Sequence, residues 1–331
     1  MAKILITGAS GFVGGFLVSE ALEQGLEVYA GMRSSSSKQW LQDDRINFLI
    51  MDLSDRESLR ATMEEHRFDY VIHNAGLTKA LKQSDLFRVN SDYSINLAKA
   101  AMTVPSLKKF SFMSSLASYG TADYQDDGVV GNHSEPKPIT SYGRSKLRAE
   151  QQLERLDGLP LMIFRPTGIF GPREGDFLNL FQSINKGLAV QVGFTEQQLS
   201  LIYVKDLVRI ILQATTSDVI NRAYFVSDGN LYAGSKFNQI VSNSLNKKPW
   251  NIKVPMALID VIATLSDLNS KITGKPNILS RDKLPEIKSR NIDIDISDLV
   301  RDFDFKPAYT LEEAVQETAD WYVKNDWLWV R

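Results

Sequence analysis

The chain has 331 residues, 43% hydrophobic and 24% charged, so it is long enough to bury a large core and to carry a second lobe. Its 38 Lys and Arg residues nearly balance 40 Asp and Glu residues, and a net charge of −2 argues against nucleic acid or an anionic membrane as a partner. The lack of cysteine excludes disulfides, thiolate metal sites and cysteine nucleophiles, and a cytoplasmic protein is expected.

Apolar runs rich in β-branched and aromatic residues alternate with helix-compatible segments through the first half of the chain. The runs expected to form strands are residues 4–7, 27–32, 46–51, 70–74, 109–114 and 161–165. This alternation predicts a Rossmann-type α/β fold, in which helices cover both faces of a doubly wound parallel sheet. The first domain is expected over residues 1–171.

The alternation of strand-like and helix-like segments ends after Gly171 and Pro172. Residues 176–186, 256–268 and 311–325 look like helices, which predicts a smaller, mostly helical substrate-binding lobe over residues 172–203 and 229–331. A helix at 204–214 and a strand at 222–227 are expected to return residues 204–228 to the first sheet. The best candidate for a membrane span, residues 254–265, is short and is interrupted by Asp260, so no span is predicted.

A glycine-rich loop follows the first expected strand and opens a helix. Gly8 permits a tight turn, Gly11 lets the backbone approach a pyrophosphate, and Gly14 lets the helix pack closely on the strand. The free N–H groups of the helix N-terminus would bind the phosphates. The loop therefore predicts a nicotinamide dinucleotide site, in which Ser10, Phe12 and Val13 also take part.

The end of the second strand normally selects between the two dinucleotides. A carboxylate there binds the ribose hydroxyls of NAD, whereas an arginine accepts the 2′-phosphate of NADP. Here Arg33 and a run of serines stand in that place, and no carboxylate does. We therefore predict NADP over NAD; the alternative is that Arg33 stacks on the adenine or lies in solvent.

Tyr142 and Lys146 stand four residues apart, hence on one face of a helix. A free tyrosine has a pKa of about 10, so a nearby ammonium group and the positive nicotinamide ring are needed to make it a base near neutrality. Alone, such a pair occurs on many helices. Together with the glycine loop, and with Ser114 and Ser115 at the end of the fifth strand, it predicts a catalytic site.

With these motifs, the chain resembles the extended short-chain dehydrogenase/reductases, the group of NAD-dependent epimerase/dehydratase enzymes. The end of its second strand is similar to that of the dihydroflavonol-reductase and 3β-hydroxysteroid-dehydrogenase branch. The matching pieces lie in family order over about two thirds of the chain. They are residues 7–14, Asp52-Leu53, His73 to Gly76, Val89-Asn90, Ser114-Ser115 with Tyr119-Gly120, Tyr142 to Lys146, Arg165-Pro166 with Phe170 to Pro172, and Tyr203 to Leu207.

The resemblance implies roles for these residues. It implies Ser115, Tyr142 and Lys146 as catalytic groups, with Ser115 bonding the reacting oxygen and Tyr142 as acid/base. Further contacts to the cofactor would come from Asp52 and Leu53 at the adenine, Asn74, Ala75 and Gly76 along the dinucleotide, Ser114, and Pro166 and Thr167 beside the nicotinamide, with Asn90 supporting the site. Asp52 could instead cap a helix, Asn90 could simply bond backbone, and Ser114 is the rival of Ser115.

The reaction type is narrowed by the residues after Ser115. Members that eliminate water usually carry an acidic pair there, whereas this chain has Leu116 and Ala117, which transfer no proton. The main expectation is an oxidoreductase moving hydride between the cofactor and a carbinol or carbonyl carbon. The alternatives are a nucleotide-sugar epimerase that retains NAD and a non-catalytic sensor or scaffold that binds NAD(P).

The expected partner is a small molecule: a nucleotide sugar, a ketone or an aldehyde. His66, His73 and His133 lack metal-ligand spacing, and no metal is expected. His73 ends a buried strand, where a satisfied core histidine is the simpler interpretation. By resemblance alone, a homodimer through the helices at 91–102 and 141–155 is expected.

Overall fold

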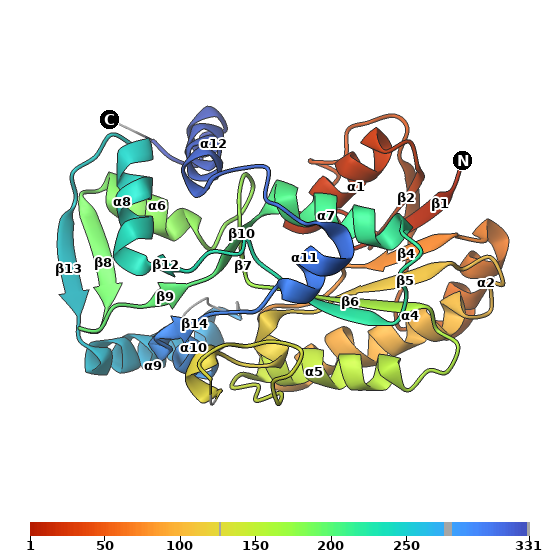
Figure 1. Ribbon diagram of the computed structural model, residues 1–331, viewed down its shortest axis with the longest axis horizontal. Helices are drawn as coiled ribbons and strands as arrows, with labels where there is room; N and C mark the ends of the chain where they lie inside the picture. Colours follow the sequence, from red (N-terminus) through yellow and green to blue (C-terminus); the bar gives the residue numbers. More distant parts are fainter. Residues whose placement is uncertain (126, 275–279, 330–331) are drawn as a thin grey trace.

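The structure is a computed structural model that describes residues 1–125, 127–274 and 280–329, without the side chains of Leu268 and Lys271. Its centre is a seven-stranded parallel sheet with strand order β11-β6-β5-β4-β1-β2-β3 (Figure 1). The strands are β1 Lys3–Thr7, β2 Glu27–Met32, β3 Asn47–Ile50, β4 Tyr70–His73, β5 Lys109–Met113, β6 Leu161–Pro166 and β11 Arg222–Val226. The α/β fold predicted from the sequence is confirmed, and the strand order reverses at β1, where open sheets bind ligands.

Alternating side chains of the strands form two buried layers. Ile4 and Ile6 pack on the face covered by α1 (Phe12–Glu23) and α7 (Val204–Thr216). Leu5 points to the opposite face, covered by α2 (Arg56–His66), α4 (Tyr93–Ala101) and α5 (Ser141–Glu154). Both faces of the sheet are apolar because helices cover its inner strands on both sides. The sheet is therefore a rigid base for the loops at its carboxyl edge.

The second lobe lies beyond the carboxyl edge of the sheet (Figure 1). Its helices are α6 Leu178–Asn185, α8 Gly234–Ser244, α9 Met256–Thr273, α10 Leu284–Lys288 and α12 Leu311–Lys324. It also contains short strands that the sequence analysis did not identify: β8 Leu188–Val192 beside β13 Trp250–Val254, and β12 Tyr232–Ala233, β9 Gln198–Leu199 and β14 Asn291–Ile292 in a second small sheet. A third pair, β7 Gly168–Phe170 and β10 Leu201–Tyr203, leads back toward the main sheet.

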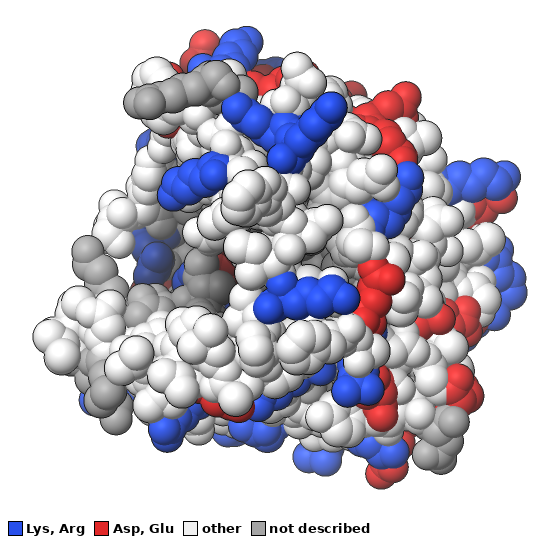
Figure 2. All heavy atoms as spheres, turned by 90° about the vertical axis from the view of Figure 1, so that its left-hand side faces the viewer, with Lys and Arg blue, Asp and Glu red and all other residues white. Residues whose placement is uncertain are grey.

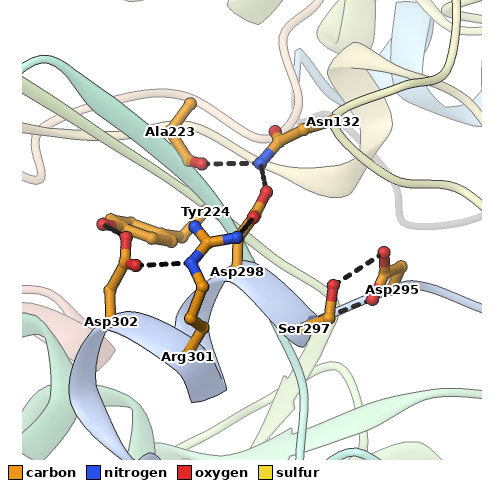
Figure 3. Close-up of polar contacts among 8 residues, drawn as sticks. All are labelled: Asn132, Ala223, Tyr224, Asp295, Ser297, Asp298, Arg301 and Asp302. Atoms are coloured by element: carbon orange, nitrogen blue, oxygen red, sulfur yellow. Dashed lines mark hydrogen bonds and ion pairs between the residues drawn. The ribbon is translucent and has the colours of Figure 1, made fainter.

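The edge strand β11 is covered by α11 (Ser297–Phe303), which comes from the C-terminal part of the chain (Figure 3). The Tyr224 hydroxyl donates to Asp302 at 2.6 Å, and Arg301 pairs with both Asp298 and Asp302. Asn132 donates to the Ala223 carbonyl at 2.9 Å and to Asp298 at 2.7 Å. These contacts cover an edge that would otherwise offer unpaired backbone groups to another chain.

Two kinds of feature are absent from the described part of the chain. None of the helices in the described residues is both long enough and apolar enough to cross a bilayer. Nor do the described residues gather three or more potential metal ligands at one place.

Candidate active site

The glycine loop joins β1 to α1 by a turn that side chains would obstruct. Gly8 has a φ of +67°, and a Cβ there would lie 2.8 Å from the Cα of Ala75. A Cβ on Gly14 would lie 2.1 Å from the Gly8 carbonyl oxygen, so α1 packs directly on the loop. Gly11 precedes the first residue of α1, and no side chain caps that helix end. Its free N–H groups therefore face the space above the loop, as a phosphate site requires.

A cavity of about 1180 Å³ runs from this loop across the carboxyl ends of the strands to the second lobe. Single-ligand pockets usually measure about 300–1,000 Å³, so this one has room for a dinucleotide and a second molecule. Most of the site residues predicted from the sequence line it: Gly8, Ser10, Gly11, Phe12, Val13, Arg33, Asp52, Leu53, Asn74, Ala75, Gly76, Ser114, Ser115, Tyr142, Lys146, Pro166 and Thr167. Gly14 and Asn90 lie behind the cavity wall.

Tyr142 and Ser115 are brought together by the start of α5. Thr140 caps this helix by accepting the Gly143 N–H at 3.1 Å. Gly143 also permits a close approach, because a Cβ there would lie 2.0 Å from the Ala117 carbonyl oxygen. The 3₁₀ turn Leu116–Ser118, which Ser115 caps, can therefore lie against the first turn of α5. Ser115 and Tyr142 meet at the end of the cavity nearest the second lobe.

The pKa of Tyr142 is raised to about 12, chiefly because burial disfavours the phenolate. A hydrogen bond from the Ser115 side chain favours the phenolate and lowers this pKa, whereas the negative charge of Glu286 raises it. In the protein alone Tyr142 is thus a phenol at neutral pH. A positive charge beside it, such as an oxidised nicotinamide ring, is what would turn it into a base.

Lys146 lies deeper in the same wall. Its Nζ donates to the Met113 carbonyl oxygen at 2.7 Å and lies 4.9 Å from the centre of the Phe112 ring. Burial lowers the pKa of Lys146 to about 8, although the charge of Glu150 opposes that shift. The charge of Lys146 was predicted to lower the pKa of Tyr142, but here the side chain that lowers it is Ser115.

The hydroxyls of Ser114 and Ser115 have different partners. Ser114 donates a very short hydrogen bond to Glu150, which also accepts from Arg165 at 2.7 and 3.0 Å. Glu150 and Arg165 form a buried ion pair behind the cavity. The Ser114 hydroxyl is thus held in this network, whereas the Ser115 side chain hydrogen-bonds to Tyr142 in the cavity.

Asn90 connects the loop after β4 to the catalytic helix. It accepts the Leu77 N–H at 2.7 Å, and its amide donates to the Leu77 carbonyl and to Ser145 Oγ, both at 2.9 Å. Ser145 in turn donates to the Tyr142 carbonyl at 2.7 Å. Asn90 stands in a π-helical turn, Arg88–Asp92, a distortion common at functional sites. It bonds backbone, and it thereby fixes one side of the cavity.

His73 is a core residue. Its two ring nitrogens lie 2.7 Å from Thr7 Oγ1 and 2.9 Å from Ser94 Oγ, and burial lowers its pKa to about 3. It is therefore neutral at every physiological pH. It fixes the end of β4 to β1 beside the glycine loop.

At the far end of the cavity lie Arg33 and Asp52. Arg33 is exposed at the rim with Ser34, Ser35 and Ser36. Asp52 accepts from the backbone N–H and the hydroxyl of Ser54, at 2.9 and 2.6 Å. The cap of α2 is Asp55, which accepts the Ser58 N–H, so the helix-capping alternative for Asp52 does not apply.

The sequence analysis did not identify two acidic residues that line the cavity: Glu286 on α10, and Glu174 in the segment between β7 and α6. Glu286, on α10, accepts a hydrogen bond from Thr140 at 3.1 Å, and burial raises its pKa. Its position near Tyr142 depends on contacts between residues 146 apart in sequence, which no local pattern reveals. Lys283 lines the cavity beside it.

The fold and this site define a Rossmann-type enzyme of the short-chain dehydrogenase/reductase class, which uses a nicotinamide cofactor. Residues 4–226 match the model of the NAD dependent epimerase/dehydratase family, and the chain belongs to that family.

Its relatives include several epimerases. The chain is 27% identical to UDP-glucose 4-epimerase of Vibrio cholerae, over 97% of this chain and 96% of that one. It is 30% identical to N-acetyl-alpha-D-glucosaminyl-diphospho-ditrans,octacis-undecaprenol 4-epimerase of Escherichia coli O157:H7, over 84% and 83% of the two chains. Among solved structures, UDP-glucose 4-epimerase of Thermotoga maritima with UDP-glucose superimposes with a TM-score of 0.78 and 21% identity, covering 98% of this chain and 99% of that one.

Proposed function

We propose that the protein is a sugar epimerase that retains its nicotinamide cofactor and inverts a carbinol carbon of a diphosphate-linked sugar. The observation that carries this proposal is the meeting of Ser115 and Tyr142 in a cavity large enough for two ligands. Leu116 and Ala117, beside Ser115, offer no acid for elimination of water. The family and the relatives support epimerisation better than the net reduction first expected, and they give no support to the narrower dihydroflavonol-reductase branch.

The glycine loop fits the cofactor, because Gly8 and Gly14 leave no room for a Cβ and the end of α1 is uncapped. Gly8, Gly11 and the N-terminus of α1 would hold its pyrophosphate, while Lys146, Pro166 and Thr167 would lie by its nicotinamide end. The bound cofactor would supply reversible hydride transfer to and from the sugar carbon.

The chain's own residues handle the proton. Tyr142 Oη would take the proton of the sugar hydroxyl as the carbonyl forms and give it back when the opposite face is reduced. Ser115 would donate a hydrogen bond to the same oxygen and hold it beside Tyr142. Because proton and hydride both return, the reaction is redox neutral and the cofactor need not leave.

The carrier part of the substrate would extend into the second lobe. A smaller cavity of about 330 Å³ adjoins the main one through Asp176 and Phe177, and Val190, Val192 and Leu199 add apolar lining. Among the described residues that line it there is no Lys or Arg, and Glu196 adds a negative charge. It suits an uncharged group, such as a nucleotide base, better than a phosphate.

The proposal is tested by purifying the protein and assaying it with UDP-glucose and UDP-N-acetylglucosamine. We expect the cofactor to copurify, and the C4 epimer to form with no lasting change in nicotinamide absorbance. Stoichiometric consumption of added NADPH with a ketone or aldehyde would instead establish the reductase. Tight cofactor binding with no turnover of any sugar, ketone or aldehyde would favour the sensor.

Substitution of Arg33 tests whether the cofactor is NAD or NADP. We propose NAD, because the family is described as NAD dependent and an epimerase recycles its cofactor. Replacing Arg33 with alanine should then change the affinity for NAD by less than about threefold, as expected for an exposed side chain that binds no phosphate. If the cofactor is NADP, the same substitution removes a charge-assisted contact, and affinity should fall by about tenfold or more. Calorimetric titration of both dinucleotides distinguishes these results.

The charge of Glu286 is expected to influence the pH dependence of kcat/KM. Its negative charge raises the pKa of Tyr142, so Glu286→Gln should lower that pKa. Because Tyr142 must lose its proton to act as base, the rising limb of kcat/KM against pH should move to lower pH in the variant. Glu174→Gln is the matched control, since Glu174 lines the same cavity but does not contribute to the pKa of Tyr142. An unmoved limb in Glu286→Gln would contradict this assignment.

We also propose a homodimer through α4 and α5, as the resemblance implies. Sedimentation equilibrium of the purified protein checks it, and a monomer at assay concentration would refute it.

A further inference from the structure

Helix α9 turns polar side chains toward the protein. Asp260 pairs with Lys288 of α10 at 2.6 Å. The Thr264 hydroxyl accepts from Arg281 Nε, and the Asp267 carboxylate accepts from Arg281 N–H, each at 3.2 Å. Ile259 and Ala263 are buried beside these contacts. The helix is thus fixed to α10 and to the 3₁₀ turn before it by hydrogen bonds and an ion pair.

The opposite side of α9 is an apolar stripe in solvent. Leu258, Val261, Ile262, Leu265 and Ile272 are 49, 55, 40, 59 and 84% exposed. Their spacing places them along one side of the helix. In a surface helix of a globular protein such a stripe normally faces the core. Here it faces outward, and large exposed apolar patches mark interaction sites.

The segment around this stripe is strongly basic. Residues 247–290 contain nine Lys and Arg against four Asp and Glu, a net charge of +5, whereas the whole chain carries −2. Exposed Lys248 and Lys253 lie just before the helix, and Trp250 between them is 79% exposed. Figure 2 views this end of the molecule, where blue side chains border a broad uncharged surface and most red ones lie toward the right-hand margin.

The charge indicates what covers the stripe. A second copy of the chain would bring two segments of +5 together, and like charges repel, so self-association through α9 is disfavoured. An apolar helix stripe with Trp and Lys beside it is instead the pattern of a helix lying in a membrane interface, where the lysines meet anionic headgroups.

We propose that α9 docks this end of the protein onto an anionic lipid bilayer, with the stripe among the upper acyl chains and the exposed side chains of Lys248 and Lys253 at the headgroups. This interaction goes beyond the proposed reaction and departs from the expectation of no membrane partner. Because α9 is attached to α10, which carries Glu286 into the large cavity, docking would hold the substrate-binding end of the molecule against the membrane.

The test is cosedimentation of the full-length protein with vesicles of phosphatidylcholine alone or with about 30% phosphatidylglycerol. We expect binding to the anionic vesicles only, and its loss at about 0.5 M salt, where screening shortens the Debye length to roughly 4 Å. The double substitution Val261→Asn with Leu265→Asn should lower the bound fraction by about tenfold or more, because both side chains are taken to enter the acyl region. Ile220→Asn is the matched control: Ile220 is 48% exposed between α7 and β11 and should not affect binding.

Three results would overturn the proposal: no binding by the wild type, equal binding by the double variant, or a wild-type dimer without lipid that the double variant loses. Both variants should melt like wild type and turn over a dissolved nucleotide sugar normally, since α9's stripe is outside the cavity. Loss of membrane binding and failure of the proposed reaction are therefore told apart by separate measurements.

Discussion

Replacing Tyr142 with phenylalanine should lower kcat by about 10²- to 10⁴-fold, the usual contribution of a positioned acid/base group. The hydroxyl is lost while the ring remains, so the cavity keeps its shape. Cofactor binding should therefore stay near the wild-type value, and single-turnover measurements should show slow hydride transfer. The measurement is steady-state turnover of the identified sugar, together with a titration of the dinucleotide.

Tyr124→Phe is the control for this prediction. Tyr124 is 46% exposed and is not among the cavity-lining residues. The variant should turn over normally. Should Tyr142→Phe also retain full activity, another group must move the proton, and Glu286 would be the next candidate because it lines the cavity near Tyr142.

Replacing Gly14 with alanine should abolish cofactor binding by a different route. The added Cβ would lie 2.1 Å from the Gly8 carbonyl oxygen and 2.8 Å from the Cα of Ala9. Backbone cannot move aside as a flexible side chain can, so α1 must shift away from β1. We expect a loss of about 1–3 kcal/mol in the free energy of unfolding and at least about tenfold in dinucleotide affinity.

Gly175→Ala is the matched control, because a Cβ at Gly175 would meet nothing within 4 Å and its φ is not positive. It should melt and bind cofactor like wild type. Chemical denaturation and calorimetric titration check both variants. Normal dinucleotide affinity in Gly14→Ala would mean that the close packing of α1 on the loop is not what forms the phosphate site.

The first half of the fold was predictable because its strands, apart from the edge strand β3, are buried on both faces. Such strands are apolar along their whole length, and the predicted strands differ from the observed ones by at most a residue or so at each end. The glycine loop and the Tyr142 helix were predictable as well, since each depends on short-range spacing. The cavity now brings them together, although the role of each residue stays a prediction.

The second lobe was less predictable for two physical reasons. Strands such as β9, β12 and β14 have two residues each and show no periodicity to detect. The spacing in α9 correctly predicts a helix, but periodicity identifies an apolar stripe without saying whether protein, lipid or solvent faces it. Glu286 is brought near Tyr142 by a tertiary hydrogen bond from Thr140, and its raised pKa comes from burial that only the folded chain creates.

The position of β11 affects how the chain can be synthesised. Once residues up to Gly171 have left the ribosome, six strands of the main sheet are free to pair, yet β6 still has an open edge, because its neighbour β11 is residues Arg222–Val226. The segment between them, with α6, β8 and α7, must emerge before that edge is paired, and α11 covers the new edge only later. Nascent chains of intermediate length should therefore be the ones that aggregate or need a chaperone, because an unpaired strand edge readily pairs with another chain.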